Sequence, residues 1–229
     1  MTQLRIDLNA DLGEEFGDDR SIFPFLSSAN IACGAHAGSP EAMETALTEA
    51  ATLGVCVGAH VSYEDREGFG RRRLDVPSAQ LQRSLEAQIQ RLQELAARHR
   101  VPVRYVKPHG ALYQRVAEGG EHAQALVSAV NACNPDMELL VPFSTAFHVI
   151  AHPLACRHEF FADRGYHFDG RLVDRSETSA HIVSVDGVVA RTLRWVREGV
   201  VTSVEGRDVH IDAESICIHG RSEEHTSEL

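Results

Sequence analysis

Short apolar runs alternate with segments of helical periodicity along nearly the whole chain. Residues 78–98 carry the clearest helical pattern, because their apolar side chains recur every three or four positions and share one face. These side chains are Leu81, Leu85, Ile89, Leu92 and Leu95. A second helix is expected to begin after Ser39, an N-cap residue followed by proline, and to end at Gly54, a favourable C′ residue.

Seven apolar runs have the length of buried strands: Leu4–Leu8, Ala29–Cys33, Val55–Ala59, Val103–Lys107, Glu138–Val141, Glu159–Ala162 and Ser215–Ile218. Strands that alternate with helices in this way predict a parallel sheet covered by helices, either open or closed into a barrel. No G-x-G-x-x-G turn follows the first strand, which disfavours a nucleotide-binding Rossmann fold. We therefore expect one α/β domain over residues 1–220, with an irregular hairpin or lid at 164–186.

Polar loops follow most of these strands, and several contain histidine beside glycine. His36, His60, His109 and His219 each lie within three residues of an expected strand end. In a parallel barrel these ends converge at one mouth, which is where such folds place their active sites. We therefore predict that one cavity is lined by Asp7, Asp11, His36, His60, Lys107, His109 and Arg164.

The first strand carries three polar side chains at alternating positions. Asp7, Asn9 and Asp11 should face the same side of the strand. Two converging carboxylates can bind a cation, or divide into an acid and a base as their pKa values separate. His36 and His60 lack the helical H-E-x-x-H spacing, so they are metal ligands, proton shuttles or substrate-binding groups assembled by the fold.

Two cations follow other strands and need anionic partners. Lys107 requires either a carboxylate such as Asp7 or an oxyanion of the substrate. Arg164 offers a fork for a substrate carboxylate, although a pair with neighbouring Asp163 is an equal alternative. The Gly-Phe-Gly-Arg-Arg-Arg run at 68–73 is more typical of a surface loop than of a phosphate site, and the chain contains no P-loop pattern.

Charge and composition indicate which classes of binding partner are disfavoured and which cellular compartment is expected. The 229 residues include 33 acidic and 22 basic side chains, a formal charge of −11. This balance disfavours nucleic acid or an anionic membrane as the main partner. Because there is no apolar run of about 18 residues, no secretory signal and no C-x-x-C pair, we expect a cytoplasmic protein with reduced cysteines.

The last nine residues, 221–229, have a different character from the rest of the chain. They read Arg-Ser-Glu-Glu-His-Thr-Ser-Glu-Leu, with a single apolar residue, and cannot bury a helical face. We expect an unstructured, non-native tail and a barrel that lacks its final helix. A genuine disordered tail is the alternative.

Several stretches match one family pattern in order along the chain: residues 6–14, 28–34, 36–38, 58–60, 65–71, 106–113 and 161–166, then Val173, Arg175, Ser176, Cys217, His219 and Gly220. Together they resemble the LamB/YcsF family. The chain departs from the pattern at Ser39, Val61 and Glu64, where Asp, Pro and Pro are usual. The change at Ser39 removes a carboxylate from the expected mouth.

The resemblance implies a seven-stranded parallel β/α barrel similar to polysaccharide deacetylases. It also implies membership of a three-part 5-oxoprolinase, which opens 5-oxo-L-proline to L-glutamate while hydrolysing ATP, with subunits B and C as partners. We assign catalysis to Asp11, His36, His60, Lys107 and His109. We assign substrate binding to Asp7, Asn9, Glu14, Asp65, Arg66, Arg164 and His219. A divalent metal, if bound, is expected on Asp11, His36 and His60.

Two other functions remain open on this sequence. The first is a stand-alone metal-dependent deacetylase or amidase, in which Asp11, His36 and His60 share one cation. The second is a subunit that takes no part in catalysis and only holds its partners together.

Overall fold

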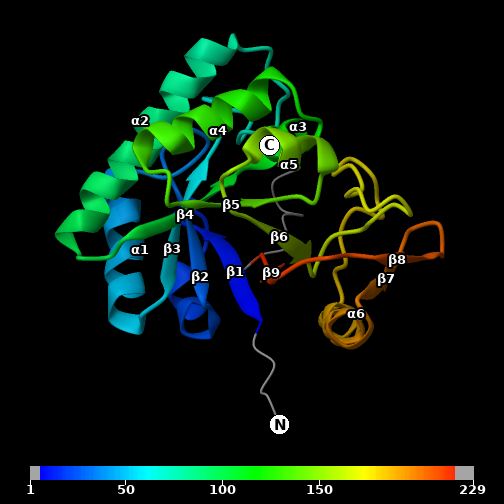
Figure 1. The fold of residues 1–229 in the computed structure, drawn as a ribbon. Helices are drawn as coiled ribbons and strands as arrows, with labels where there is room; N and C mark the ends of the chain where they lie inside the picture. The colour runs from blue at the N-terminus through cyan, green and yellow to red at the C-terminus, as the bar shows by residue number, and fades with distance from the viewer. Residues whose placement is uncertain (1–5, 220–229) are drawn as a thin grey trace.

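The computed structural model describes residues 6–219, and its centre is a closed barrel of seven parallel strands (Figure 1). The strands are β1 (Asp7–Leu12), β2 (Ser28–Ala32), β3 (Cys56–Val61), β4 (Val103–Pro108), β5 (Glu138–Val141), β6 (Cys156–Phe161) and β9 (Ser215–Cys217). They pair in the order β1-β2-β3-β4-β5-β6-β9, and β9 closes the ring against β1. The predicted seven-stranded barrel is therefore confirmed.

Within residues 6–219, six helices and a small hairpin lie around the barrel (Figure 1). The helices are α1 (Pro40–Leu53), α2 (Ser78–Arg98), α3 (Gly110–Ala117), α4 (Glu121–Cys133), α5 (Thr145–Ala151) and α6 (Val185–Glu198). Two 3-10 turns cover Asp19–Ser21 and Phe23–Phe25. The antiparallel hairpin of β7 (Val200–Thr202) and β8 (Asp208–His210) lies beside α6, apart from the barrel strands. Within residues 6–219 no helix follows β9.

The two helices expected from periodicity form where the sequence places them. The five predicted apolar side chains of α2 are all buried. In α1, the hydroxyl of Ser39 accepts a hydrogen bond from the Ala42 amide at 3.2 Å, and Gly54 ends the helix with φ +70°. Ser39 therefore caps a helix in this chain.

The first strand extends beyond its predicted end. It runs over Asp7–Leu12 because its residues Asn9 to Leu12 pair in register with β2, from Ser28 to Ile31. Its inward positions are polar, so a search for apolar runs stops too early. The irregular segment predicted at 164–186 is bridged internally, at Arg164 with His181 and at Tyr166 with Leu172.

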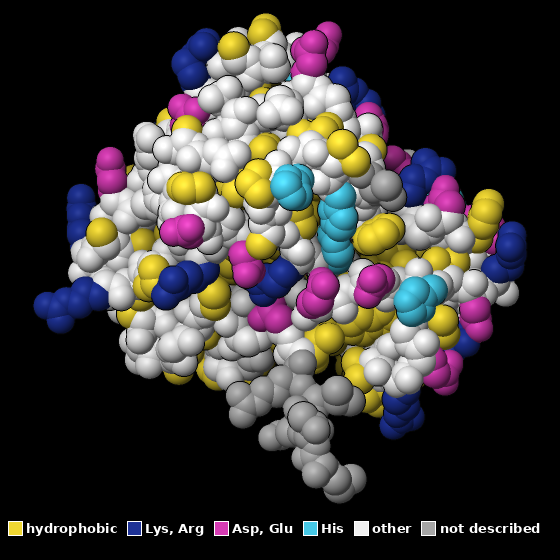
Figure 2. All heavy atoms as spheres, in the orientation of Figure 1, with side chains coloured by type: hydrophobic (Ala, Val, Ile, Leu, Met, Phe, Trp, Pro, Cys, Tyr) yellow, Lys and Arg dark blue, Asp and Glu magenta, His cyan; other side chains and the backbone are white. Residues whose placement is uncertain are grey.

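The remaining expectations concern the surface and the ends of the chain. No helix among the described residues is long and apolar enough to cross a membrane. On the face shown in Figure 2, acidic and basic side chains are interspersed rather than gathered by sign. The predicted tail, residues 221–229, lies outside the described residues.

Candidate active site

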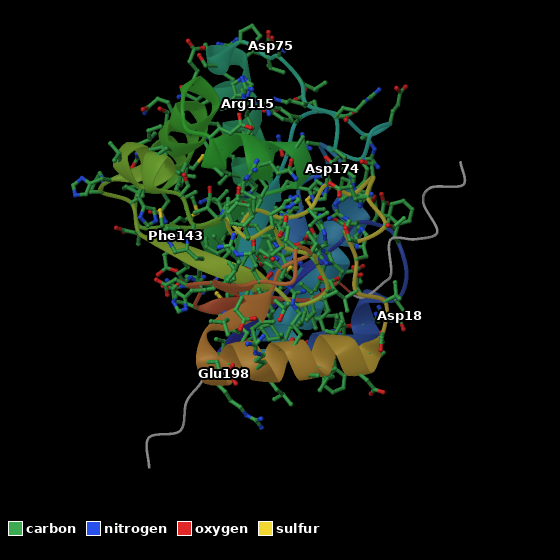
Figure 3. The ribbon with its side chains drawn as sticks, turned by 90° about the vertical axis from the view of Figure 1, so that its right-hand side faces the viewer. Asp18, Asp75, Arg115, Phe143, Asp174 and Glu198 are labelled. Carbon is green, nitrogen blue, oxygen red and sulfur yellow. The ribbon has the colours of Figure 1, made fainter. Side chains whose placement is uncertain are left out.

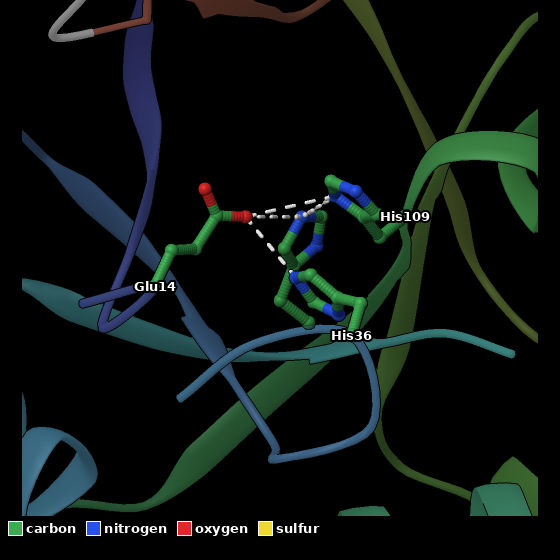
Figure 4. Close-up of side chains that lie close together, drawn as sticks. Glu14, His36 and His109 are labelled. Carbon is green, nitrogen blue, oxygen red and sulfur yellow. Dashed lines mark hydrogen bonds and ion pairs between the residues drawn. The ribbon is translucent and has the colours of Figure 1, made fainter. Parts of the chain in front are cut away.

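Three loops and the end of β3, at the carboxyl end of the barrel, bring one carboxylate and three imidazoles together (Figure 4). The Oε1 atom of Glu14, after β1, lies 3.1 Å from Nε2 of His36, which follows β2. The same oxygen lies 3.7 Å from Nδ1 of His109 and 3.9 Å from Nε2 of His60. His36 and His109 therefore share one end of the barrel, as predicted.

Two glycines allow the loops to approach this closely. A Cβ on Gly38 would lie 2.7 Å from the Gly13 carbonyl oxygen, so the loop that carries His36 packs directly on the loop after β1. A Cβ on Gly110 would lie 2.5 Å from the carbonyl oxygen of Gly70. Both glycines have positive φ, a conformation that residues with a Cβ rarely adopt.

The hydrogen bonds of His60 and His109 fix where their ring protons lie. Nδ1 of His60 faces the Lys107 carbonyl at 3.1 Å, and Nε2 of His109 faces the Phe69 carbonyl at 3.0 Å. A carbonyl oxygen only accepts, so each of these nitrogens donates a proton. The other nitrogens, Nε2 of His60 and Nδ1 of His109, face each other at 2.9 Å with lone pairs when both rings are neutral. Only a shared proton or a cation can satisfy this pair.

Carboxylates add further acceptors at the same point. Oδ2 of Asp11 lies 3.2 Å from Nε2 of His60, on the side away from the Lys107 carbonyl.

Burial lowers the pKa of His36, and burial together with the two neighbouring imidazoles holds the pKa of His109 well below its usual value. Neutral imidazole is the form that accepts a proton or binds a metal.

Lys107 is buried inside the barrel between two carboxylates. Its Nζ lies 2.9 Å from Oδ1 of Asp11 and 3.0 Å from Oε2 of Glu159, with Sγ of Cys217 at 3.4 Å. Burial alone would lower the pKa of Lys107, but the negative charges around it, Asp11 first, raise the pKa well above its usual value. The side chain is therefore a fixed ammonium ion, suited to stabilising negative charge.

Asp11 holds the opposite charge at the same place. Burial would raise its pKa, yet the positive charges of His60 and Lys107 outweigh burial and keep the pKa well below normal. Asn30 also donates a hydrogen bond to Oδ1 of Asp11 at 2.8 Å. His219 lies beside Asp11, with its Nε2 3.9 Å from Oδ2 of Asp11. The other ring nitrogen of His219, Nδ1, is hydrogen-bonded to Oδ2 of Asp163 at 2.7 Å.

Asp7 lies at the other end of the barrel, which corrects its expected position. Its carboxylate accepts hydrogen bonds from Ser27 and Ser28, at the start of β2, and from Ser215, at the start of β9. A strand rises about 3.3 Å per residue, so four residues separate Asp7 from Asp11 by roughly 13 Å. Asp11 and Glu159, instead of Asp7, are the partners of Lys107.

Asn9 lies between these ends, in the barrel interior. Its amide nitrogen donates to Ser215 at 2.7 Å, and its oxygen accepts from Asn30 at 2.8 Å. Tyr105 completes the layer by donating to Asn30 at 2.6 Å. This hydrogen-bonded layer packs against Lys107 and Asp11 on the side away from the mouth.

Asp65 and Arg66 shape the loop after β3 and do not line the cavity at the mouth. Asp65 accepts from the Gly68 amide at 3.0 Å and pairs with Arg72. Arg66 donates to the Gly38 carbonyl at 2.7 Å and to Glu15 at 3.2 Å. Their contacts hold loops together around the histidines.

Arg164 is buried and binds the backbone of its own segment. Its Nε donates to the Ala180 carbonyl at 3.1 Å and its Nη2 to the Val173 carbonyl at 2.7 Å. Two of its donors are therefore committed, and the predicted fork for a substrate carboxylate is not open in this form. These hydrogen bonds hold the 165–182 segment in place at the mouth. Asp174, which belongs to this segment, is labelled in Figure 3.

A cavity of about 210 Å³ opens at this mouth. Predicted residues on its wall are Asp11, His60, Lys107, His109, Arg164 and His219. Tyr113, Phe161 and Leu172 also border a larger groove of about 930 Å³ alongside α3 and the 165–182 segment. Sequence reasoning did not assign Glu159, Arg71 or Arg175 to the site. The signal for Glu159 was a charged residue at the start of the predicted apolar run Glu159–Ala162.

Fold and site together define a parallel β/α barrel with an ionisable, histidine-rich mouth. The sequence pattern of the LamB/YcsF family matches residues 6–227, and the chain belongs to that family. It is 43% identical over 224 residues to a 5-oxoprolinase A subunit of Agrobacterium fabrum, covering 95% of this chain and 88% of that protein. It is 44% identical over 222 residues to the 5-oxoprolinase A subunit of Kocuria rhizophila, covering 94% and 88%.

Two solved structures share this fold. A lactam utilization protein from Thermus thermophilus superposes with a TM-score of 0.89 at 38% identity, covering 94% of this chain and 90% of that one. A putative cellobiose-phosphate cleavage protein from Enterococcus faecalis gives a TM-score of 0.53 at 10% identity, covering 93% and 78%. The second likeness concerns the fold alone.

Proposed function

We propose that this chain is the A subunit of an ATP-dependent 5-oxoprolinase, which opens the lactam of 5-oxo-L-proline to give L-glutamate. ATP is the co-substrate of the complex, and subunits B and C are its partners. The observation that carries the proposal is the buried ammonium of Lys107, fixed beside Asp11 and the imidazoles at the mouth. The names of the family relatives support the same assignment.

The reaction requires activation of an ordinary amide. ATP transfers a phosphoryl group to the lactam oxygen and leaves as ADP, which makes the carbonyl carbon reactive toward water. After water adds, the ring nitrogen takes up a proton, the C–N bond breaks, and hydrolysis of the acyl phosphate that remains releases phosphate and glutamate. Lys107 is suited to stabilising the negative charge on the added oxygen as it loses its proton and the C–N bond breaks. Nδ1 of His109, which faces Nε2 of His60 at 2.9 Å, is suited to taking a proton from water and returning it to the ring nitrogen.

The facing lone pairs at the mouth also support a divalent cation. Glu14, His60 and His109 supply carboxylate and imidazole donors 2.9–3.9 Å apart, and a tetrahedral zinc site with bonds of about 2.0–2.1 Å separates its ligands by roughly 3.3 Å. His36 and His109 stack with parallel rings 3.9 Å apart, so only one of them can direct its lone pair to a shared ion. Such an ion would supply Lewis acidity and lower the pKa of bound water.

That donor set favours one competing function, a stand-alone metal-dependent deacetylase or amidase. The ligands would then be Glu14, His60 and one stacked ring, in place of the set predicted with Asp11. In this case the chain alone would hydrolyse acetylated or amide substrates and lose the activity on chelation.

An assay of 5-oxoproline-dependent phosphate release distinguishes these functions. We expect turnover only when the chain, subunits B and C and ATP are all present, and none from the chain alone. The metal content of the purified chain is measured in parallel, before and after treatment with a chelator. Complexes that carry Asp11→Asn with His109→Gln should be inactive; full activity in that double variant would leave the chain a scaffold only.

A further inference from the structure

A histidine and a carboxylate form a second hydrogen-bonded pair at the mouth. Nδ1 of His219, which follows β9, lies 2.7 Å from Oδ2 of Asp163, which follows β6. An ionised carboxylate only accepts hydrogen bonds, so Nδ1 carries a proton and Nε2 is left for another partner. His219 lines the mouth cavity, and its Nε2 lies 3.9 Å from Oδ2 of Asp11, too far for a hydrogen bond. Nε2 is therefore available to a ligand in the cavity.

The negative charge of Asp163 is stable although the side chain is largely buried. Burial would raise the pKa of Asp163, but the positive charge of His219 and the hydrogen bond from His219 outweigh burial and lower the pKa. A carboxylate on Nδ1 fixes the tautomer of a neutral imidazole, and it stabilises the imidazolium that forms when Nε2 takes up a proton. The pair is thus arranged as a proton donor held by a carboxylate.

Backbone and ring contacts hold both partners in place. The Ile182 amide donates to the Asp163 carbonyl at 2.8 Å, and the amide of the residue before His219 donates to the Asn9 carbonyl at 3.0 Å. The His219 ring stacks on the Phe161 ring, with centroids 6.0 Å apart and planes inclined by 14°. A group held in this way is oriented before a substrate arrives, which favours proton transfer.

The proton that His109 takes from water has competing acceptors. On Nδ1 of His109 it lies 2.9 Å from Nε2 of His60, with the carboxylate of Glu14 at 3.7 Å. These neighbours retain the proton, so its return to the ring nitrogen is in competition with them. Protonation of a leaving nitrogen is faster from a group whose proton is directed at the substrate.

His219 is placed to supply such a proton. In the barrel order β1 lies between β9 and β2, and β3 follows β2, so His219 and His60 approach Asp11 from different sides of β1. Their Nε2 atoms lie 3.9 Å and 3.2 Å from the same oxygen of Asp11. A reacting carbon beside Lys107 can therefore have the added water near His109 and the ring nitrogen near His219.

We propose that His219 is a further catalytic residue, the donor of the proton to the ring nitrogen, and that Asp163 positions it. This inference rests on the proposed function, because it concerns a step of the same reaction. When the C–N bond breaks, its electron pair goes to the ring nitrogen, which takes the proton from Nε2 of His219 and becomes an amine. His219 is left neutral and takes up a proton from solvent before the next turnover.

The test counts ADP and glutamate separately in the assembled complex. Phosphorylation of the lactam precedes the step assigned to His219, so His219→Gln should still form ADP in response to 5-oxoproline. Glutamate formation should fall about 10²- to 10⁴-fold, the usual contribution of a general acid, with the KM for 5-oxoproline unchanged. The ratio of ADP to glutamate then rises, because water attacks the phosphorus of the unopened phosphorylated lactam and returns 5-oxoproline and phosphate.

Two further variants separate a missing proton donor from a disturbed fold. Asp163→Asn should raise the same ratio by a smaller amount, because the imidazole remains but loses the carboxylate that orients it. His219→Ala leaves space at the cavity wall, and free imidazole added to the buffer should restore part of its glutamate formation. Thermal midpoints establish that the variants remain folded.

The chain offers a matched control pair in His167 and Glu205. Nδ1 of His167 lies 2.7 Å from Oε1 of Glu205, the separation found in the His219–Asp163 pair, but neither residue belongs to the described lining of the mouth cavity. His167→Gln and Glu205→Gln should keep the wild-type ratio of ADP to glutamate.

The outcomes distinguish this inference from the proposed function. A wild-type ratio in His219→Gln, or equal losses of ADP and glutamate, would overturn the role of His219 and leave the proposed function standing. A wild-type complex that forms no ADP in response to 5-oxoproline would overturn the proposed function, and the assignment of His219 with it.

Discussion

At the residue scale, the mouth is organised around one buried ion pair network. The ammonium of Lys107 is held by Asp11 and Glu159, and all three side chains are almost inaccessible to solvent. Removing one member of such a network is costly, because the remaining charge is left buried without a partner. A single substitution in this network is therefore expected to change both the stability of the fold and the turnover of the enzyme.

Lys107→Met is expected to lower turnover of the assembled complex by about two to three powers of ten, the usual effect of deleting one oxyanion donor. It should also destabilise the chain by about 3–5 kcal/mol, because two carboxylates lose their counter-charge. Steady-state phosphate release and urea unfolding measure the two effects.

A double variant separates them. Lys107→Met with Glu159→Gln removes the ammonium and one of its carboxylates, so stability should partly recover while turnover stays low. Recovery of turnover together with stability would show that Lys107 acts only through the fold. Wild-type turnover in the single variant would contradict the catalytic role directly.

At the scale of elements, periodicity predicted the seven barrel strands and the two long helices. Apolar runs buried on both faces are conspicuous in a parallel barrel, and α2 shows the full stripe of an amphipathic helix. The same reasoning missed the short β7–β8 hairpin, whose three-residue strands are too brief to show alternation. It also stopped β1 early, because Asn9 and Asp11 are polar residues that point into the barrel.

The sequence predicted those parts of the site that follow from the strand topology. Histidines at strand ends had to meet at one mouth, and His36, His60 and His109 do. The sequence did not predict at which end of the barrel Asp7 lies. Alternation along a strand shows which face a side chain is on, but not how far along the barrel axis it lies. Arg71 and Arg175 depend on how irregular loops fold back, for which the sequence offers no period.

Gly58 shows how tightly adjacent strands are packed. A Cβ at this position of β3 would lie 2.1 Å from the ring of Tyr105 on β4, which is fully buried and bonded to Asn30. We expect Gly58→Ala to destabilise the chain by about 1–3 kcal/mol or more, since the ring has no free space to enter.

Gly187→Ala is the matched control, measured by the same urea titration. It lies in the first turn of α6, where the added Cβ would meet only ordinary contacts at 3.4 Å and beyond. Alanine favours helix over glycine by about 1 kcal/mol, so this variant should be neutral or slightly more stable. Equal destabilisation of both variants would show that the β3–β4 contact is not special.

At the scale of the whole molecule, histidines kept neutral by their surroundings make stability depend on pH. Burial, and then the positive charges of Arg164 and Arg175, lower the pKa of His181 from 6.5 to about 4. Burial also lowers the pKa values of His36 and His109. The unfolded chain, with histidine pKa values near 6.5, therefore takes up protons before the folded chain does.

The sign of the effect follows from this order of protonation. Stability is fully present above about pH 6.5 and is lost as the pH falls through the lowered folded-state values. Carboxylates with lowered pKa values contribute only below about pH 4.5, so the interval from pH 6.5 to about 5 belongs to the histidines. We expect the urea midpoint of the metal-free chain to fall steadily across that interval. In His181→Gln the fall should be shallower, whereas a midpoint that stays constant from pH 7 to 5 would mean that these rings titrate normally in the fold.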